Sequence, residues 1–125
     1  MNLVRIAAIL GFLGVALGAF GAHGLRNRVG PEMLEIWKTG VLYHLAHALA
    51  LLGVAALGPR VGWPRAVAGL FVGGVLIFSG TLYAMVITGN FWLGRITPIG
   101  GAALLGGWAA LAASARGSTS SDRHS

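Results

Sequence analysis

Cysteine is absent from this chain, and charged residues are scarce. Only 10% of its 125 residues are charged, and only three are acidic. The missing thiols exclude disulfides, cysteine nucleophiles and cysteine-ligated metals. Soluble domains usually carry about 25% charged residues, and a soluble helical bundle of this composition would leave most of its apolar area facing water. The composition therefore favours a membrane protein.

Carboxylates are also missing from the long apolar stretches. The acidic residues are Glu32, Glu35 and Asp122, which lie in a connecting segment and in the tail. A serine–histidine–aspartate triad needs a buried acid, and a phosphate-binding loop needs a glycine signature that this chain does not contain. We therefore predict a protein that is not an enzyme, with no catalytic residue, no metal site and no resident cofactor.

What the sequence does contain is four apolar stretches of about twenty residues each: Leu3–Ala22, Thr39–Leu57, Ala66–Thr88 and Ile96–Ala115. A helix rises about 1.5 Å per residue, so each stretch can cross a hydrocarbon core of about 30 Å. Lipid cannot satisfy bare backbone groups, and runs without alternation indicate helices. We predict an all-α integral membrane protein, a four-helix transmembrane bundle over residues 1–115, followed by a disordered polar tail over residues 116–125.

The first apolar stretch also resembles a secretory signal peptide, because Arg5 precedes it and small residues end it at Ala22. It is longer than a usual signal core, and its glycines at three- and four-residue spacing would line one helix face: Gly11, Gly14, Gly18 and Gly21. Such faces let helices approach closely in lipid, so we expect a retained first helix. Similar pairs occur in the third and fourth stretches: Gly69 with Gly73, and Ala103 with Gly107.

The first connection, residues 23–38, is the longest. Pro31 and Glu32 have the order typical of a helix start, with proline in the first position and an acid in the first turn. We predict a short interfacial helix in this loop that leads into the second span, with Trp37 at the depth of the lipid headgroups.

The net charge of +6 would suit a nucleic-acid partner, but the basic residues lie at the ends of the spans, as in membrane proteins. The side that holds the N-terminus, the second connection and the tail has five: Arg5, Arg60, Arg65, Arg116 and Arg123. The other side has four: Arg26, Arg28, Lys38 and Arg95. This small excess predicts that both termini are cytoplasmic. We therefore predict a multi-pass protein of the cell inner (plasma) membrane, without a nucleic-acid partner.

Polar residues of the spans gather toward one side of the membrane. The first and third spans end there and the second and fourth begin there, which brings together a candidate polar cluster: His23, Tyr43, His44, His47, Ser79, Tyr83 and Thr97. Polar groups at membrane depth are unfavourable, so their clustering marks a candidate functional site. Because buried polar groups need partners, we expect one connected network inside the bundle.

His44 and His47 are three residues apart and share one helical face. Two imidazoles at that spacing could bind a metal or a cofactor, or relay a proton, but no carboxylate within a span supplies a third ligand. We favour a structural interpretation, in which these histidines and the tyrosines hydrogen-bond across helices.

Several blocks of the chain together resemble one family. They are Gly18–Gly24, Trp37–Leu49, Phe78–Tyr83 and Ile96–Gly101, followed by Gly107 and Trp108. In this order they are similar to the small membrane proteins catalogued as domain of unknown function 423, which include animal transmembrane protein 256. The resemblance implies a four-helix integral membrane protein and supplies no activity or substrate. His44 is not a fixed element of that pattern, so the resemblance shifts the emphasis to His23 with His47.

These observations predict a small polytopic membrane protein that binds a partner or a small apolar ligand through its polar cluster. The lipid bilayer surrounds it, and a membrane protein partner and a second copy of the chain both stay open. Two alternatives come from other classes: a small transporter or channel-like component, and a membrane subunit that holds haem or quinone through its histidines.

Overall fold

The computed structural model describes residues 2–117 as four helices with short connections. The helices are α1 (Leu3–Phe20), α2 (Pro31–Leu57), α3 (Pro64–Thr88) and α4 (Thr97–Ser114). All four are long and apolar enough to cross a membrane. The predicted all-α architecture with four spans is confirmed. The predicted disorder of residues 116–125 falls mostly outside the described residues and stays a prediction.

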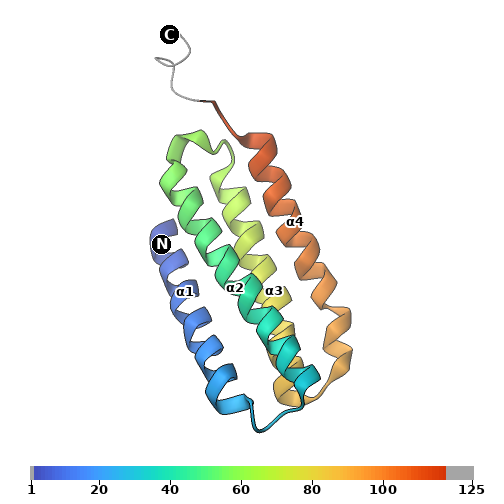
Figure 1. Cartoon of the computed structure of the whole chain (residues 1–125). Helices are drawn as coiled ribbons and strands as arrows, with labels where there is room; N and C mark the ends of the chain where they lie inside the picture. The colour runs from blue at the N-terminus through green and yellow to red at the C-terminus, as the bar shows by residue number, and fades with distance from the viewer. Residues whose placement is uncertain (1, 118–125) are drawn as a thin grey trace.

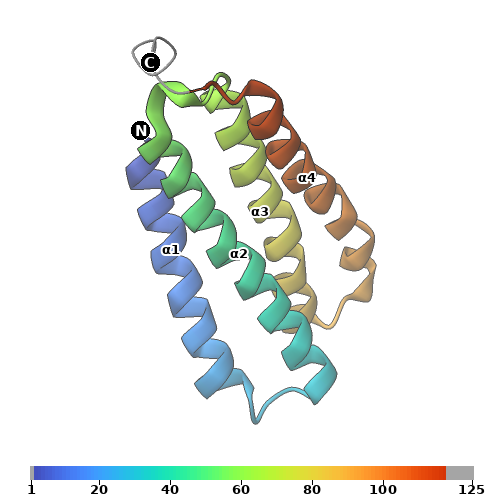
Figure 2. The same cartoon turned by 45° about the horizontal axis from the view of Figure 1, so that its top comes forward.

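The helices lie side by side in chain order (Figure 1 and Figure 2). Each packs against the next: α1 on α2, α2 on α3, and α3 on α4. The α2–α3 connection and the end of α4 lie at one end of the molecule, which we call the terminal end, and α1 begins toward the same end. A buried apolar cluster draws on all four helices and includes Leu51 and Phe71, both fully enclosed. The core therefore lies between the two central helices, α2 and α3.

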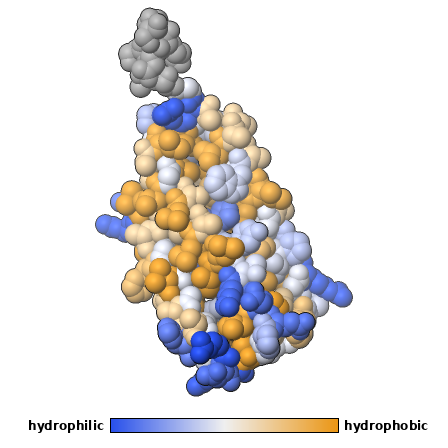
Figure 3. All heavy atoms as spheres, viewed as in Figure 1, coloured by the Kyte–Doolittle hydropathy of each residue, from blue (hydrophilic) through white to orange (hydrophobic). Residues whose placement is uncertain are grey.

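Large apolar side chains cover the outside of the helices. Phe12 is 75% exposed, and Leu105 is 73% exposed. Figure 3 shows this apolar surface over the middle of one face, with hydrophilic residues gathered mainly toward the ends. A surface of this kind is favourable in lipid and unfavourable in water. The outside of the bundle is therefore built to face a bilayer.

The predicted short interfacial helix is not a separate element. The chain is helical from Pro31, as predicted, but these residues continue without a break into the second span as the first turns of α2. Trp37 is 1% exposed and does not face the headgroups, because its ring packs against Phe20 of α1 and Tyr83 of α3. The apolar side of this segment is therefore covered by protein, which removes the reason for it to lie along the membrane surface.

Glycines set the spacing between α1 and α2, as the pattern of the first span predicts. A Cβ atom added to Gly14 would lie 2.6 Å from the Leu45 side chain, and one added to Gly18 would lie 3.2 Å from Val41. Gly21 faces α2 in the same way. A larger side chain at these positions would hold the two helices apart.

Of the other predicted small faces, the one at Gly107 is in contact with α3, but the one at Gly69 and Gly73 is not. A Cβ atom would meet nothing within 4 Å at three of those glycines: Gly11, Gly69 and Gly73. The close approach of α3 and α4 depends on Gly107, as predicted, and also on Gly74 and Gly100, which each face the neighbouring helix. Spacing identified helices with small faces, but it did not show which face meets a neighbour.

Short segments join the helices. A π-helical segment, η1 (Gly21–Leu25), extends α1, and two 3-10 turns, η2 (Gly58–Arg60) and η3 (Phe91–Arg95), follow α2 and α3. Val61 and Ala115 form an isolated antiparallel bridge that ties the end of α4 to the α2–α3 connection. The terminal end is thus closed by backbone hydrogen bonds.

Candidate functional site

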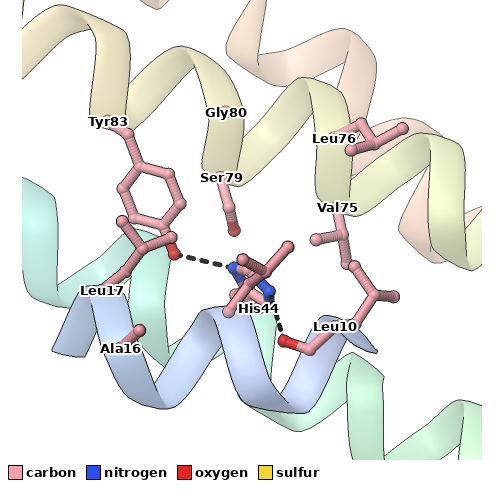
Figure 4. A pocket seen from close by; sticks show the side chains of 10 residues that line it. Leu10, Ala16, Leu17, His44, Val75, Leu76, Ser79, Gly80 and Tyr83 are labelled. Atoms are coloured by element: carbon pink, nitrogen blue, oxygen red, sulfur yellow. Dashed lines mark hydrogen bonds between the residues drawn. The ribbon is translucent and has the colours of Figure 1, made fainter. Parts of the chain in front are cut away.

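His44 joins three helices at the middle of α2. Its side chain is 5% exposed and lies beneath a groove between α1 and α3 (Figure 4). Nδ1 lies 2.9 Å from Tyr83 Oη on α3, and Nε2 lies 2.8 Å from the carbonyl oxygen of Leu10 on α1. One imidazole therefore fastens both α1 and α3 to α2.

The partners determine which nitrogen of His44 carries the proton. A carbonyl oxygen can only accept a hydrogen bond, so Nε2 carries the proton and donates to Leu10. In a neutral imidazole Nδ1 then has a free lone pair, which accepts from the hydroxyl of Tyr83. Both ring nitrogens of His44 are used by the fold.

A second ring donor repeats this attachment two helical turns away. Trp37 Nε1 donates to the carbonyl oxygen of Leu17 over 2.8 Å. Trp37 precedes His44 by seven residues on α2, and Leu17 follows Leu10 by seven residues on α1, so the two bonds recur in register on antiparallel helices. Each backbone carbonyl has a second lone pair for such a donor. Two hydrogen bonds therefore hold α1 on the face of α2 that its glycines approach.

Polar contacts also join α2 to α3. The buried hydroxyl of Ser79 donates to the carbonyl oxygen of Gly40 over 2.7 Å. A Cβ atom on Gly40 would lie 2.9 Å from the ring of Tyr83, so glycine lets that ring lie directly on α2. The tyrosine can then reach His44 with its hydroxyl.

His47 faces α4 and uses the opposite tautomer. Its side chain is 5% exposed. Nδ1 lies 2.8 Å from the carbonyl oxygen of Tyr43 and must donate to it, so Nε2 accepts from Trp108 Nε1 at 3.0 Å. The ring of Phe71 on α3 packs edge-on against the imidazole, with centroids 5.3 Å apart. His47 therefore links α2 to α4 over the surface of α3.

A third polar contact lies between α3 and α4. The hydroxyl groups of Thr81 and Thr97 are 2.6 Å apart, and Thr97 also donates to the carbonyl oxygen of Leu93 over 3.3 Å. The order Thr97-Pro98 is typical of a helix start, with the threonine as its cap. Thr97 is instead the first residue of α4, and its hydroxyl serves the contact with α3.

The candidate polar cluster is therefore divided, and the expectation of one connected network is wrong. Its members fall into three groups: His44 with Tyr83 and Ser79 nearby, His47 with Trp108, and Thr97 with Thr81. Successive residues of a helix point about 100° apart, and α2 has different neighbours in different directions. A shared depth in the membrane therefore did not bring these side chains together.

Two members of the candidate cluster are exposed. Tyr43 is 41% exposed, and its hydroxyl makes no hydrogen bond to another described residue. His23 is exposed on η1, beyond the end of α1, whereas His47 is buried against α3 and α4. The family pattern directed attention to His23 with His47, but the fold does not join them in one site.

The paired-imidazole ligand hypothesis does not fit this geometry. His44 points to α1 and α3, whereas His47 points to α4, and all four ring nitrogens take part in hydrogen bonds. Within residues 2–117 there is also no group of three or more histidine, aspartate or glutamate side chains that could hold a metal ion. The two histidines serve separate helix contacts.

Sequence reasoning left two tryptophans out of the candidate cluster. Trp37 and Trp108 donate the hydrogen bonds that reach Leu17 and His47. The signal that could have found them is chemical: an indole N–H inside an apolar span needs an acceptor on a neighbouring helix.

Two grooves accompany the histidines. The α1/α3 groove, of about 350 Å³, lies over His44 and is almost wholly apolar at its surface. A larger one, of about 540 Å³, lies between α2 and α4 over α3, and we call it the aromatic groove. Residues that line it include Tyr43, His47, Phe78, Gly101, Leu105 and Trp108. The aromatic groove is the larger and the more polar of the two.

Four apolar spans, with polar side chains confined mainly to contacts between helices, define a small polytopic integral membrane protein. The chain belongs to the family described as protein of unknown function (DUF423), which it matches over residues 17–101. The resemblance found in the sequence blocks is therefore confirmed.

Relatives occur in bacteria and in a yeast. The chain is 42% identical to the UPF0382 membrane protein YwdK of Bacillus subtilis, over 84% of this chain and 88% of the relative. It is 39% identical to the UPF0382 membrane protein C1782.12c of Schizosaccharomyces pombe, over 89% of this chain and 98% of the relative. A UPF0382 membrane protein of Haemophilus influenzae is 39% identical, over 87% of this chain and 89% of the relative. No solved structure matches the chain.

Proposed function

We propose that this protein is a membrane-embedded binding protein whose ligand is a small lipid-soluble molecule held in the aromatic groove. The observation that carries the proposal is the wall of this groove, in which aromatic rings from three helices lie together and include the partly exposed side chain of Tyr43. In the α1/α3 groove, by contrast, the polar groups of His44 and Tyr83 already bond to each other.

The rings of the aromatic groove form a continuous wall. The centroid of Tyr43 lies 4.7 Å from that of Phe78 and 6.2 Å from that of His47, with which it is stacked at 10°. Trp108 continues the wall on α4, 5.9 Å from His47. Flat ring faces and edges pack well against other planar or unsaturated groups. The wall therefore favours a ligand with a flat or unsaturated portion.

The hydroxyl of Tyr43 adds a polar preference. It is part of a side chain that is 41% exposed, and no described residue accepts its proton. Hydrocarbon cannot replace the missing partner. A ligand with a carbonyl or ether oxygen would supply an acceptor to Tyr43 while its apolar portion covers the rings. We therefore infer an apolar molecule that carries at least one such oxygen.

The size of the groove suits a small molecule better than a helix. Ligand pockets usually enclose about 300–1,000 Å³, and this groove has about 540 Å³. On α4 it extends from Pro98 to Trp108, which corresponds to about 15 Å of helix. A partner helix would contact roughly twice that length to cross the hydrocarbon core. The dimensions thus support the small-ligand form of the proposal.

A variant that fills the groove tests the proposal. A Cβ atom on Gly101 would make ordinary contacts with the Phe78 ring, at 3.6 Å, so Gly101→Leu should fold and place its side chain in the groove. Gly106→Leu is the matched control, because Gly106 lies on the same helix, has ordinary contacts to Leu70 at 3.7 Å and does not line the groove.

The measurement is the set of lipid-soluble molecules that copurify with each protein in mild detergent, identified by mass spectrometry and absorbance. We expect the parent and Gly106→Leu to retain a species that Gly101→Leu loses, with similar thermal unfolding for all three. Equal retention of every species by the three proteins would contradict the proposal.

We further propose that the protein resides in the plasma membrane with both termini in the cytoplasm. The support is the distribution of lysine and arginine, with five residues on the side of the termini and four on the other. The structure is compatible with this arrangement because the described termini lie toward the same end of the molecule.

A further inference from the structure

Two arginines are held side by side at the terminal end. Beside the bridge between Val61 and Ala115, the backbone N–H of Arg116 donates to the carbonyl oxygen of Arg60 over 2.7 Å. The two arginines are directly opposite each other in this antiparallel pair. Arg60 is the last residue of η2, and this hydrogen bond holds its backbone next to that of Arg116. Both side chains are exposed, so the backbone presents two guanidinium groups from adjacent positions.

The two positive charges repel each other, and a bound anion would offset that repulsion. Arg65 adds a further positive charge in the first turn of α3. The acidic residues that the structure describes, Glu32 and Glu35, lie at the other end of the molecule in the first turns of α2. Within residues 2–117, no carboxylate at the terminal end can neutralise the pair.

The position of the pair indicates which anion fits. The arginines follow within three residues of the ends of two apolar spans, α2 at Leu57 and α4 at Ser114. Trp63, in the same connection, is 54% exposed, and exposed tryptophans beside span ends are typical of headgroup depth. Lipid phosphates lie at that depth. Arginine binds a phosphate through two parallel N–H···O bonds, which gives both affinity and orientation.

We propose that Arg60 and Arg116 together bind the phosphate of an anionic membrane phospholipid, and that the bridge between Val61 and Ala115 holds them in position for it. The site is independent of the aromatic groove, since neither arginine lines that groove. A lipid with a net negative headgroup charge is preferred over a zwitterionic lipid, because Arg60, Arg65 and Arg116 together attract the net charge.

The test compares lipid binding by the full chain in detergent, measured by native mass spectrometry with phosphatidylglycerol and with phosphatidylcholine. Arg60→Gln with Arg116→Gln should weaken binding of phosphatidylglycerol by about tenfold or more, because charge-assisted hydrogen bonds are lost. Binding of phosphatidylcholine should change little. The matched control is Arg26→Gln with Arg28→Gln, which removes two exposed arginines from a connection at the opposite end.

Two further variants and a competitor separate the outcomes. Arg60→Lys with Arg116→Lys keeps the charge but loses the planar fork, and it should recover only part of the binding. If the two double-glutamine variants lose equal amounts of phosphatidylglycerol binding, the attraction is a diffuse electrostatic one and the proposed site is overturned. Displacement of the lipid by inorganic phosphate at constant ionic strength would indicate a free-anion site and overturn the lipid assignment.

The same experiment includes a control for correct folding of the variants. Because the glutamine pair removes a repulsion, it should melt at or above the temperature of the parent in lipid-free detergent. If it unfolds, the lysine pair takes its place, and unchanged binding of phosphatidylglycerol by that pair would then overturn the role of the guanidinium fork.

Discussion

The imidazole of His44 joins a backbone carbonyl of α1 to a hydroxyl of α3, and no other described side chain makes hydrogen bonds to two neighbouring helices. His47 reaches only one neighbouring helix through a hydrogen bond, and its partner Trp108 is 47% exposed. At the scale of single residues, these differences reverse the ranking that the family pattern suggests. The more connected histidine is the one that the pattern does not fix.

Replacing His44 by alanine should lower the free energy of unfolding by about 1–3 kcal/mol, because the hydroxyl of Tyr83 is left without its acceptor. His47→Ala should cost less, since the imidazole of His47 makes a hydrogen bond to only one neighbouring helix. Unfolding in detergent, followed by circular dichroism, measures both. Leu42→Ala, at a position 65% exposed to lipid, is the control. A larger loss for His47→Ala than for His44→Ala would contradict this ranking.

At the scale of helices, α1 is attached to α2 both by glycines, which allow close approach, and by hydrogen bonds from ring side chains. Glycines allow it to approach α2, and the ring donors Trp37 and His44 then reach its carbonyl oxygens. The two effects depend on each other, because a hydrogen bond of 2.8 Å is lost when the backbones separate by even one methyl group. The glycine face of α1 is therefore a packing surface.

Gly18→Leu should separate α1 from α2 and lower the free energy of unfolding by about 1–3 kcal/mol. A Cβ atom there already approaches Val41 to 3.2 Å, so the remaining side-chain atoms have no room. Gly11→Leu is the matched control, since a Cβ atom at Gly11 meets nothing within 4 Å. Thermal unfolding and size-exclusion chromatography in detergent measure the effect. If the two variants have the same unfolding temperature and the same elution volume, the glycine face of α1 does not pack on α2.

At the scale of the whole molecule, four spans in chain order place the described termini toward one end. The cytoplasmic orientation proposed for that end can be tested with single cysteines, because the chain has no cysteine of its own. In intact cells, Asn27→Cys should react with a membrane-impermeant maleimide and Gly117→Cys should not. Both positions are exposed, so disruption of the cells should make both reactive. Labelling of Gly117→Cys in intact cells would reverse the orientation.

The amino-acid sequence by itself determined the class of protein and the positions of its spans. Four apolar runs without carboxylates leave no other stable arrangement, because lipid forces each run to satisfy its backbone as a helix. The glycine face of α1 and the membership of the family could also be predicted from the sequence, since both depend on the spacing of residues along one chain. The helix start at Pro31 followed from local chemistry alone.

Only the tertiary structure decided which side chains meet. His44 and His47 are three residues apart and equally buried, yet they serve different neighbours, because the direction of a side chain around a helix matters only once the surrounding helices are in place. For the same reason Trp37 is enclosed although its segment looked interfacial. The bridge that places Arg60 beside Arg116 joins segments 56 residues apart, and no local pattern encodes a contact that depends on how α4 returns to the α2–α3 connection.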